Sequence, residues 1–159
     1  MAAVIATEEL PVRDLQPDDF AKGFLELLAQ LTSVGPVTER EFCDRLHAMR
    51  TCGLIHVLVI EAAGRIVAVG TLMVEPKFVH GCGACGHIED VVVDQSCRGK
   101  RLGERIIREL KRVAASRGCY KVILDCSESN EGFYAKCGFK RKEIQMRCDM
   151  VADAGPGKL

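Results

Sequence analysis

The chain has 159 residues, of which 48% are hydrophobic and 28% are charged, a composition that favours a folded domain with a buried core. Its 22 basic residues balance 22 acidic ones, so no overall charge attracts nucleic acid or an anionic membrane, and any anion site must be local. No apolar run approaches the length of about 18 residues that spans a bilayer, and the sequence begins without a secretion signal. We therefore expect a soluble, intracellular protein with a single domain across residues 1–159, ordered from about residue 9 to 150 and followed by a flexible tail at 151–159.

The first third of the chain predicts one strand followed by two helices. Residues 12–15 suit a short strand, and Pro17 with two acidic neighbours opens a helix that carries its apolar residues on one face. The segment 32–36 contains Gly and Pro and ends this helix. Thr38 and Glu41 then form a capping box that begins a second helix.

The remaining elements alternate between strands and helices. In order, they are strands at 54–61 and 65–75 joined by a turn at 62–64, a strand at 87–93, a helix from 102 to a stop at 117–118, a strand at 120–124, a short helix at 130–137 and a last strand from Phe139 to about Asp149. The order is β-αα-βββ-α-β-α-β. It predicts an α/β (α+β) fold with a central mixed sheet flanked by helices and without an internal domain boundary.

A basic turn with two glycines, Arg98-Gly99-Lys100-Arg101-Leu102-Gly103, lies between an apolar strand and a helix. A strand, turn and helix in this order point unpaired backbone N–H groups and the positive end of the helix dipole at one spot. Gly99 and Gly103 let the backbone approach a ligand closely, and the basic side chains add positive charge. The turn therefore predicts a site for the phosphate or pyrophosphate of an anionic cofactor.

Nine cysteines are scattered along the chain, and in a non-secreted protein this pattern indicates reduced thiols and not a disulfide framework. Cys82 and Cys85 form a C-x-x-C motif flanked by His80 and His87, a set that is able to hold zinc. Structural zinc sites usually combine two separated half-sites, and the glycines here equally describe a long loop between strands. We therefore expect no metal and keep zinc as an alternative.

Glu89 and Asp90 are consecutive within an apolar strand, so their side chains should point to opposite faces of the sheet. Because an unpaired carboxylate is costly to bury, we expect a specific partner for the one that enters a site, such as an ammonium group or sugar hydroxyls. A salt bridge within the sheet is the alternative.

The element order and the turn resemble the GNAT superfamily of acetyl-CoA-dependent N-acyltransferases. The turn fits the pattern Arg/Gln-x-x-Gly-x-Gly/Ala with Arg98 first and Gly103 last, although Arg101 replaces the middle glycine. Within GNAT, the chain from about Val12 to Met150 resembles the glucosamine 6-phosphate N-acetyltransferase family. The resemblance is carried by residues 86–93, 98–103, 118–126 and 133–139, with support from Leu31-Thr32 and Lys77-Phe78-Val79-His80.

The resemblance implies that acetyl-CoA lies with its pyrophosphate on the turn and its pantetheine between the strand ending near Val93 and the strand starting at Tyr120. A backbone N–H near Val91 would bind the thioester oxygen, and the Tyr134 hydroxyl would stabilise or protonate the departing thiolate, although a lone aromatic residue more often belongs to a core. The cofactor-binding residues expected on this basis are Val91, Val92, Val93, Arg98, Gly99, Lys100, Arg101, Leu102, Gly103, Asn130, Tyr134, Ala135 and Lys136.

The resemblance also implies transfer of the acetyl group to the 2-amine of D-glucosamine 6-phosphate by direct sequential attack, for UDP-N-acetylglucosamine biosynthesis. The catalytic candidates are Tyr134, Asp125 and Glu89; Asp125 would orient the amine or relay its proton, or act only as a strand-end cap. The substrate-binding candidates are Thr32, Lys77, Phe78, Val79, His80, Glu89, Asp90, Val91, Tyr120, Lys121, Asp125 and Arg147, where Lys121 is the counter-charge for the 6-phosphate and Arg147 is offset by about two positions from the family pattern. The sugar site would be shared between the two subunits of a homodimer.

The chain ends in Gly157-Lys158-Leu159, a small-basic-leucine tripeptide after a spacer of small residues. This is the form of the Ser-Lys-Leu peroxisomal address, so import into a peroxisome or glycosome-type microbody by an import receptor is one expectation, and a cytoplasmic location is the other.

Two other functions stay open: a GNAT enzyme for a polyamine or a protein lysine, and a non-enzymatic acyl-CoA-binding or zinc-binding module.

Overall fold

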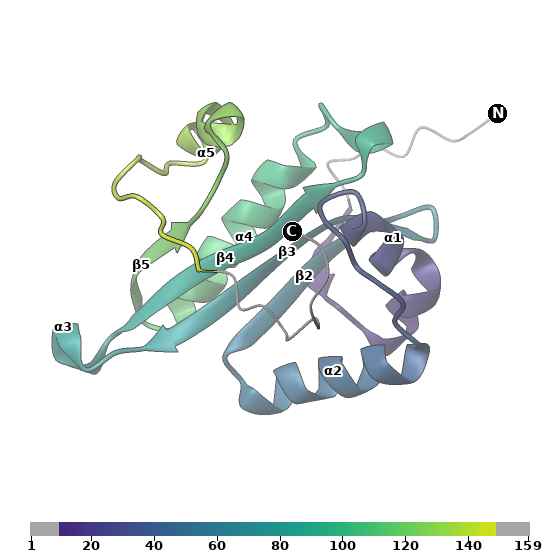
Figure 1. Ribbon diagram of the computed structural model, residues 1–159, viewed down its shortest axis with the longest axis horizontal. Coiled ribbons are helices and arrows are strands. Elements are labelled where there is room, and N and C mark those ends of the chain that lie inside the picture. Colours follow the sequence, from purple (N-terminus) through teal and green to yellow (C-terminus); the bar gives the residue numbers. More distant parts are fainter. Residues whose placement is uncertain (1–9, 149–159) are drawn as a thin grey trace, which may run out of the picture. The chain divides into compact units, whose positions relative to one another are not determined.

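The computed structural model describes residues 10–148, which form two compact units that divide between Leu124 and Asp125 (Figure 1). The first unit contains a five-stranded sheet in the order β1-β2-β3-β4-β5. These strands are β1 (Val12–Asp14), β2 (Ile55–Ala62), β3 (Arg65–Pro76), β4 (Ala84–Val93) and β5 (Cys119–Leu124). Neighbouring strands are antiparallel except for the parallel pair β4–β5, so the expected mixed, mostly antiparallel sheet is confirmed.

Helices cover both faces of this sheet. The helices of this unit are η2 (Pro17–Lys22), α1 (Phe24–Leu28), α2 (Glu39–Cys52), α3 (Val79–Cys82) at the tip of the β3–β4 hairpin (Figure 1), η3 (Gln95–Cys97) and α4 (Leu102–Ser116). The capping box of α2 is confirmed, since the Glu41 N–H donates to Thr38 Oγ1 and the Thr38 N–H donates to Glu41 Oε2. The expected first helix is interrupted at Gly23, whose left-handed φ of 79° ends η2 and begins α1.

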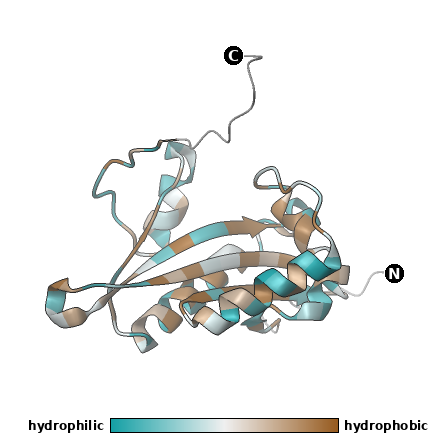
Figure 2. Ribbon diagram, turned by 60° about the horizontal axis from the view of Figure 1, so that its bottom comes forward, coloured by the Kyte–Doolittle hydropathy of each residue, from teal (hydrophilic) through white to brown (hydrophobic). Residues whose placement is uncertain are grey.

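The strands alternate between two cores, as period-2 side chains require. Val59 and Val69 pack with α1 and α2 on one face of the sheet. On the other face lies α4, whose Ile106 and Leu110 are fully buried; a Cβ on Gly70 would lie only 2.5 Å from Ile106 Cγ2. The mostly apolar colouring of the strands in Figure 2 reflects this burial on both sides.

A β-bulge interrupts β4 at Asp90. Val69 pairs with Val92 and Thr71 pairs with Glu89, so β4 has one residue more than β3 across this step, and Asp90 takes a left-handed φ of 51°. Regular alternation is therefore interrupted at this step, and the expectation that Glu89 and Asp90 point to opposite faces stays a prediction. Both residues are exposed, so the expected cost of burying a carboxylate does not arise.

The second unit contains η4 (Glu128–Asn130) and α5 (Glu131–Lys136). The strand expected from Phe139 to about Asp149 is absent over residues 139–148, which have no regular secondary structure. Ile144 and Met146 do alternate with polar residues, but they are 87% and 89% exposed. A strand requires a hydrogen-bonded neighbour, and the described part of this unit contains no other strand to supply one.

Within residues 10–148, no helix is long and apolar enough to cross a membrane. The single-domain expectation stays a prediction. The tail at 151–159 lies outside the described residues.

Candidate active site

The basic turn leads directly into α4 and leaves the first turn of that helix open to a ligand. Gly99 has a φ of 78° with nothing within 4 Å of a Cβ built on it. Arg101 is the N-cap of α4 in the left-handed conformation, and its side chain makes no capping hydrogen bond. The leading N–H groups of α4 therefore lack a side-chain cap, which is the condition for binding an anion at a helix N-terminus.

The basic side chains of the turn contribute less free positive charge than the sequence predicts. The Arg101 guanidinium pairs with Glu104, at 2.9 Å from Nη2 to Oε2, so its charge is largely compensated locally. The Arg98 Nε–H donates to the Val93 carbonyl at 3.4 Å, which ties the turn to the end of β4. Lys100 is exposed. Backbone amides and the helix dipole thus form the main part of this candidate anion site, and basic side chains supplement them.

The strands β4 and β5 part next to the bulge. Their parallel pairing ends at Ile88 and Leu124, so residues Glu89–Val93 have only β3 as a strand partner among the described residues. This agrees with the expected gap beside Val91, Val92 and Val93. A free strand edge offers backbone N–H and C=O groups to a ligand.

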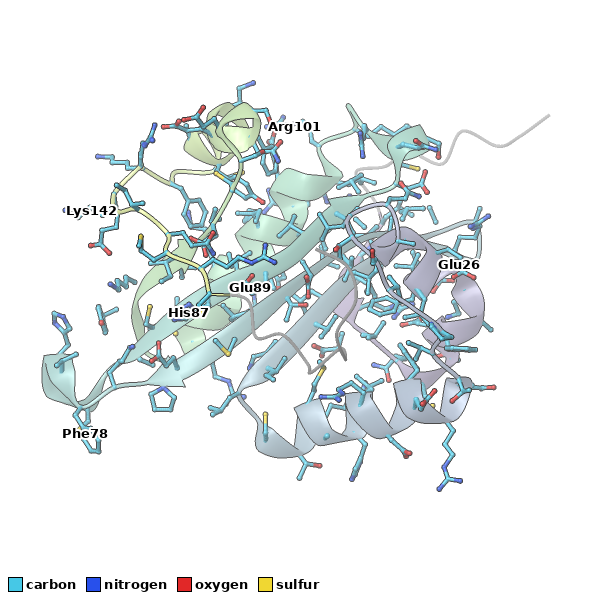
Figure 3. All side chains as sticks on the ribbon, viewed as in Figure 1. Glu26, Phe78, His87, Glu89, Arg101 and Lys142 are labelled. Atoms are coloured by element: carbon cyan, nitrogen blue, oxygen red, sulfur yellow. The ribbon has the colours of Figure 1, made fainter. Side chains whose placement is uncertain are left out.

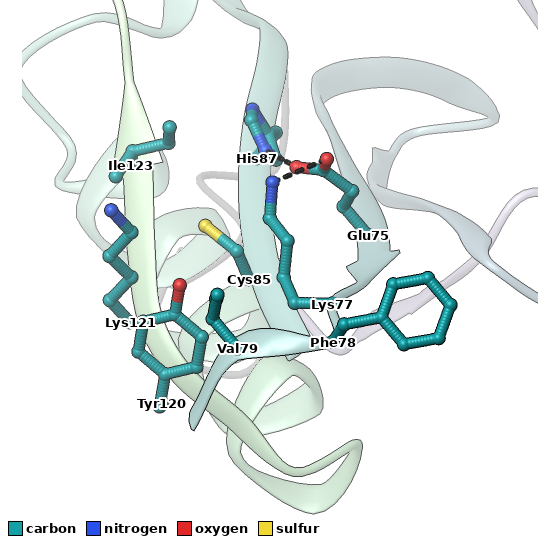
Figure 4. A pocket seen from close by; sticks show the side chains of 9 residues that line it. All are labelled: Glu75, Lys77, Phe78, Val79, Cys85, His87, Tyr120, Lys121 and Ile123. Carbon is teal, nitrogen blue, oxygen red and sulfur yellow. Dashed lines mark hydrogen bonds and ion pairs between the residues drawn. The ribbon is translucent and has the colours of Figure 1, made fainter. Parts of the chain in front are cut away.

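A second feature of the first unit is a cavity of about 420 Å³ between the ends of β3, β4 and β5 (Figure 4). Cys85, which is 1% exposed, belongs to its lining. The full lining consists of Glu75, Lys77, Phe78, Val79, Cys85, His87, Tyr120, Lys121 and Ile123. Five of these, Lys77, Phe78, Val79, Tyr120 and Lys121, are expected substrate-binding residues.

A carboxylate organises one wall of the cavity. Glu75 forms an ion pair with Lys77 Nζ and a 2.8 Å hydrogen bond with His87 Nε2. The hydrogen bond from Lys77, followed by the bond from His87, lowers the pKa of Glu75, and Glu75 in turn raises the pKa of Lys77. Burial raises the pKa of the Cys85 thiol, so Cys85 is not an activated thiolate.

The tip of the β3–β4 hairpin lies beside this cavity. The His80 ring stacks on the Tyr120 ring, with centroids 4.1 Å apart, although His80 itself has a left-handed φ of 55°. Phe78 is 97% exposed and projects from the tip (Figure 3). The hairpin therefore combines a residue fixed against β5 with a large apolar side chain that has no cover in the described chain.

Comparison with known proteins agrees with this architecture. The family model described as "Acetyltransferase (GNAT) family" matches residues 14–139. The chain belongs to the GNAT acetyltransferase family. The Arabidopsis thaliana protein named "Glucosamine 6-phosphate N-acetyltransferase" is 49% identical over 142 residues, which cover 87% of this chain and 95% of the relative. A Trypanosoma brucei brucei relative of the same name is 44% identical over 143 residues, which cover 89% of this chain and 97% of the relative.

A solved structure supports the same assignment. The crystal structure of glucosamine-6-phosphate N-acetyltransferase from Arabidopsis thaliana superimposes with a TM-score of 0.87 at 48% sequence identity, covering 89% of this chain and 99% of that chain. The expected GNAT fold is confirmed. Arg101, where this chain departs from the GNAT turn pattern, occupies the left-handed position that favours glycine.

The second unit of this GNAT chain carries the other candidates. Tyr134 lies in α5, and its ring packs edge-on against Phe133 at a centroid distance of 4.9 Å. Asp125 follows β5 and accepts a 2.6 Å hydrogen bond from Gln145 Nε2. Arg147 lies in the irregular segment that replaces the expected last strand. Asn130 ends η4, and Ala135 and Lys136 lie in the last turn of α5.

The structure brings together some of the sequence candidates and adds others. Thr32 is exposed after α1 and does not belong to the cavity lining; neither do Glu89 and Asp90. Four lining residues were missed: Glu75, Cys85, His87 and Ile123. The strand was expected to start at His87 instead of Ala84, and this error hid the spacing of two residues between Cys85 and His87.

The C-x-x-C motif is divided between two elements, with Cys82 in α3 and Cys85 in β4. All nine cysteines are free thiols in this structure. Over residues 10–148, no three His, Cys, Asp or Glu side chains gather in a way that could hold a metal ion.

Proposed function

We propose that this protein transfers the acetyl group of acetyl-CoA to the 2-amine of D-glucosamine 6-phosphate, giving N-acetyl-D-glucosamine 6-phosphate and CoA. The observation that carries the proposal is the 49% identity over 95% of a relative that bears the name of this activity. The product would serve UDP-N-acetylglucosamine biosynthesis.

The donor side fits a CoA pyrophosphate. N–H groups are available to an anion at the N-terminus of α4, which has no side-chain cap, and at the left-handed backbone of Gly99. The free edge of β4 beyond Ile88 offers N–H groups to an extended pantetheine arm. Polarisation of the thioester oxygen by a β4 backbone N–H near Val91 would stabilise negative charge as it develops.

The acceptor side fits a hexose phosphate. A cavity of about 420 Å³ is in the size range of small-molecule sites, and Lys121 supplies a cation for the phosphate. The amine of a 2-amino sugar is less basic than the ~10.4 of lysine, so much of it is neutral near pH 7 and ready to attack. Positioning by Asp125 and Glu89 would then matter more than proton abstraction.

The chemistry requires no covalent acyl-enzyme. The amine nitrogen attacks the thioester carbon, a C–N bond forms, the C–S bond breaks, and the amine proton is lost as the CoA sulfur gains one. Tyr134 would give a proton to that sulfur or hydrogen-bond to it, since a free thiol has a pKa of ~8.5 and a phenol ~10. Neither Cys126 nor Cys137 takes part in this scheme.

We also propose that the active form is a homodimer with active sites shared between subunits. Support comes from exposed apolar side chains beside the cavity, where Phe78 and Val79 on the hairpin and Ile123 on β5 are 97%, 58% and 40% exposed. β5 is also an edge strand in the described sheet. Large exposed apolar groups next to an open strand edge are typical of an interface.

Release of the CoA thiol tests the activity. With acetyl-CoA present, we expect turnover with glucosamine 6-phosphate, at least about 100-fold less with glucosamine, because the phosphate contact is lost, and none with a polyamine or a lysine peptide. Initial rates should show sequential kinetics. Equal turnover with a polyamine would assign a different acceptor, and ping-pong kinetics with a trapped acetyl-cysteine would overturn direct transfer.

The location of the protein is a separate proposal. We infer import into a microbody through Gly157-Lys158-Leu159, read by a peroxisomal import receptor. A fluorescent protein fused in front of the full chain should become punctate, and the same fusion without Leu159 should be diffuse. Identical diffuse distributions would instead support a cytoplasmic location.

A further inference from the structure

The cavity contains two lysines in different electrostatic settings (Figure 4). Lys77 on the hairpin is paired with the Glu75 carboxylate. Lys121 on β5 has no carboxylate within ion-pair distance among residues 10–148, and its ammonium group lies 5.9 Å from the Tyr120 ring centroid. Lys121 therefore presents an uncompensated charge to the cavity, and Lys77 does not.

Both lysines act on the same part of the cavity. Cys85 pairs with Glu75 on one side and with Lys121 on the other in the strand register. Burial is the main cause of the raised pKa of the Cys85 thiol; the charges of Lys121 and then Lys77 act against it, and the charge of Glu75 adds to it. Both lysines line the cavity together with Cys85 (Figure 4), so a ligand anion in the cavity has two ammonium groups as alternative partners for one phosphate.

Glu75 is held so that it blocks one of these positions. One carboxylate oxygen bonds to Lys77 Nζ and the other bonds to His87 Nε2 at 2.8 Å, so each oxygen of Glu75 is held by a neighbouring side chain. The charged and titratable groups of the cavity are Glu75, Lys77, Cys85, His87, Tyr120 and Lys121. Among the described residues, Glu75 is the only carboxylate in this lining.

We propose that Glu75 determines the orientation of the phosphate-bearing acceptor, because its charge cancels that of Lys77 and leaves Lys121 as the position for the phosphate. The inference rests on the proposed function and extends it to a specificity-determining residue. Glu75 is a positioning residue, since it acts through the charge of Lys77 and not on the reacting atoms. A phosphate bound at Lys77 would direct the sugar, and therefore its amine, differently.

The variant Glu75→Gln separates this role from a structural one. Glutamine keeps the size of the side chain but removes the charge, so Lys77 becomes a second position for the phosphate. Substrate bound there is unproductive and competes with productive binding, which lowers kcat and KM by the same factor, about three- to tenfold, and leaves kcat/KM unchanged. Competitive inhibition by inorganic phosphate should become tighter by a similar factor.

Matched variants test the mechanism. Adding Lys77→Met to Glu75→Gln removes the second position, so the tighter inhibition by inorganic phosphate should be lost again. Glu75→Asp keeps the charge and should behave like the unchanged protein, as should Glu109→Gln, which removes a carboxylate paired with Arg112 on α4 away from the cavity. Glu75→Ala, which also removes the charge, replaces Glu75→Gln if that variant fails to fold.

The outcomes are decisive in either direction. A fall in kcat/KM at an unchanged or higher KM, or weaker inhibition by phosphate, would overturn the inference and make Glu75 a structural or a direct binding residue. Titration of inorganic phosphate into each variant by calorimetry tests the same point without turnover. If the unchanged protein does not acetylate glucosamine 6-phosphate, the proposed function fails, and the three- to tenfold change in phosphate affinity still decides the role of Glu75.

Discussion

At the scale of single residues, Arg101 combines a glycine-like backbone with a charged side chain. Its φ of 58° costs an L-residue roughly 1–2 kcal/mol, and its guanidinium pairs with Glu104 instead of remaining available to a ligand. The backbone conformation of the turn therefore matters more for an anionic donor than this side chain does.

We expect Arg101→Gly to change the Kd of CoA by less than about threefold, because the backbone amides proposed to bind the pyrophosphate remain. Gly99→Val should raise the Kd about tenfold or more, since valine is strained at a φ of 78°. Equilibrium titration with CoA measures both. A large loss of affinity in Arg101→Gly would show that the guanidinium itself binds the donor.

His56 predicts a pH dependence of stability. Arg117 Nε donates to His56 Nε2 at 3.2 Å, and burial followed by the Arg117 charge lowers the pKa of His56 below its usual 6.5. Below that pH the unfolded chain binds a proton that the folded chain resists, so the free energy of unfolding declines. Denaturant unfolding between pH 8 and pH 5 should show a smaller decline in His56→Gln, and the same decline as the unchanged protein in His47→Gln on the exposed side of α2.

At the scale of elements, the contact between β3 and α4 depends on the absence of a side chain. Gly70 lies next to the Asp90 bulge, and a Cβ there would lie 2.5 Å from Ile106 and 2.9 Å from Leu110. Because interiors are close-packed, α4 would have to shift, and the turn before it would shift as well. The bulge and the turn at residues 98–103 are thus linked through packing.

Gly70→Ala should lower the free energy of unfolding by about 1–3 kcal/mol through overpacking. Gly132→Ala in α5 is the matched control, because nothing lies within 4 Å of its added Cβ; it should be neutral or stabilising by up to about 1 kcal/mol. Urea denaturation of the two variants measures the difference. Equal stabilities would mean that α4 adjusts without strain.

At the scale of the whole molecule, the proposed homodimer explains why one chain exposes apolar groups beside a charged cavity. If Lys121 serves the active site of the neighbour, Lys121→Met and Gly99→Val should each have low activity alone when acetyl-CoA is kept well below the raised Kd of Gly99→Val. When the two variants are mixed, unfolded and refolded together, the mixture should recover about a quarter of the original activity. Half of the dimers are then hybrids, and each hybrid has one intact site out of two. No recovery in mixtures that light scattering confirms as dimers would show that each site lies within one subunit.

Much of the fold could be predicted because its signals are local. The capping box of Thr38 and Glu41, the alternation along β2 and β3, and the turn before α4 each depend on residues a few positions apart. The prediction of a last strand was wrong because it also depended on a local signal alone. Alternation at 139–148 specifies a pattern of side chains, and a strand also needs a partner that no local pattern supplies.

The sequence by itself determined the family, and it predicted the turn before α4 and the substrate candidates, since these depend on motifs of consecutive residues. Only the tertiary structure decided that Glu75, Cys85 and His87 share a cavity with Lys121, because strand register brings together residues far apart in the chain. The tertiary structure also decided the position of the bulge at Asp90, where β4 has one residue more than the paired strand β3. Register is set by hydrogen bonds between strands and by packing across the sheet, and neither is encoded in the spacing along a single strand.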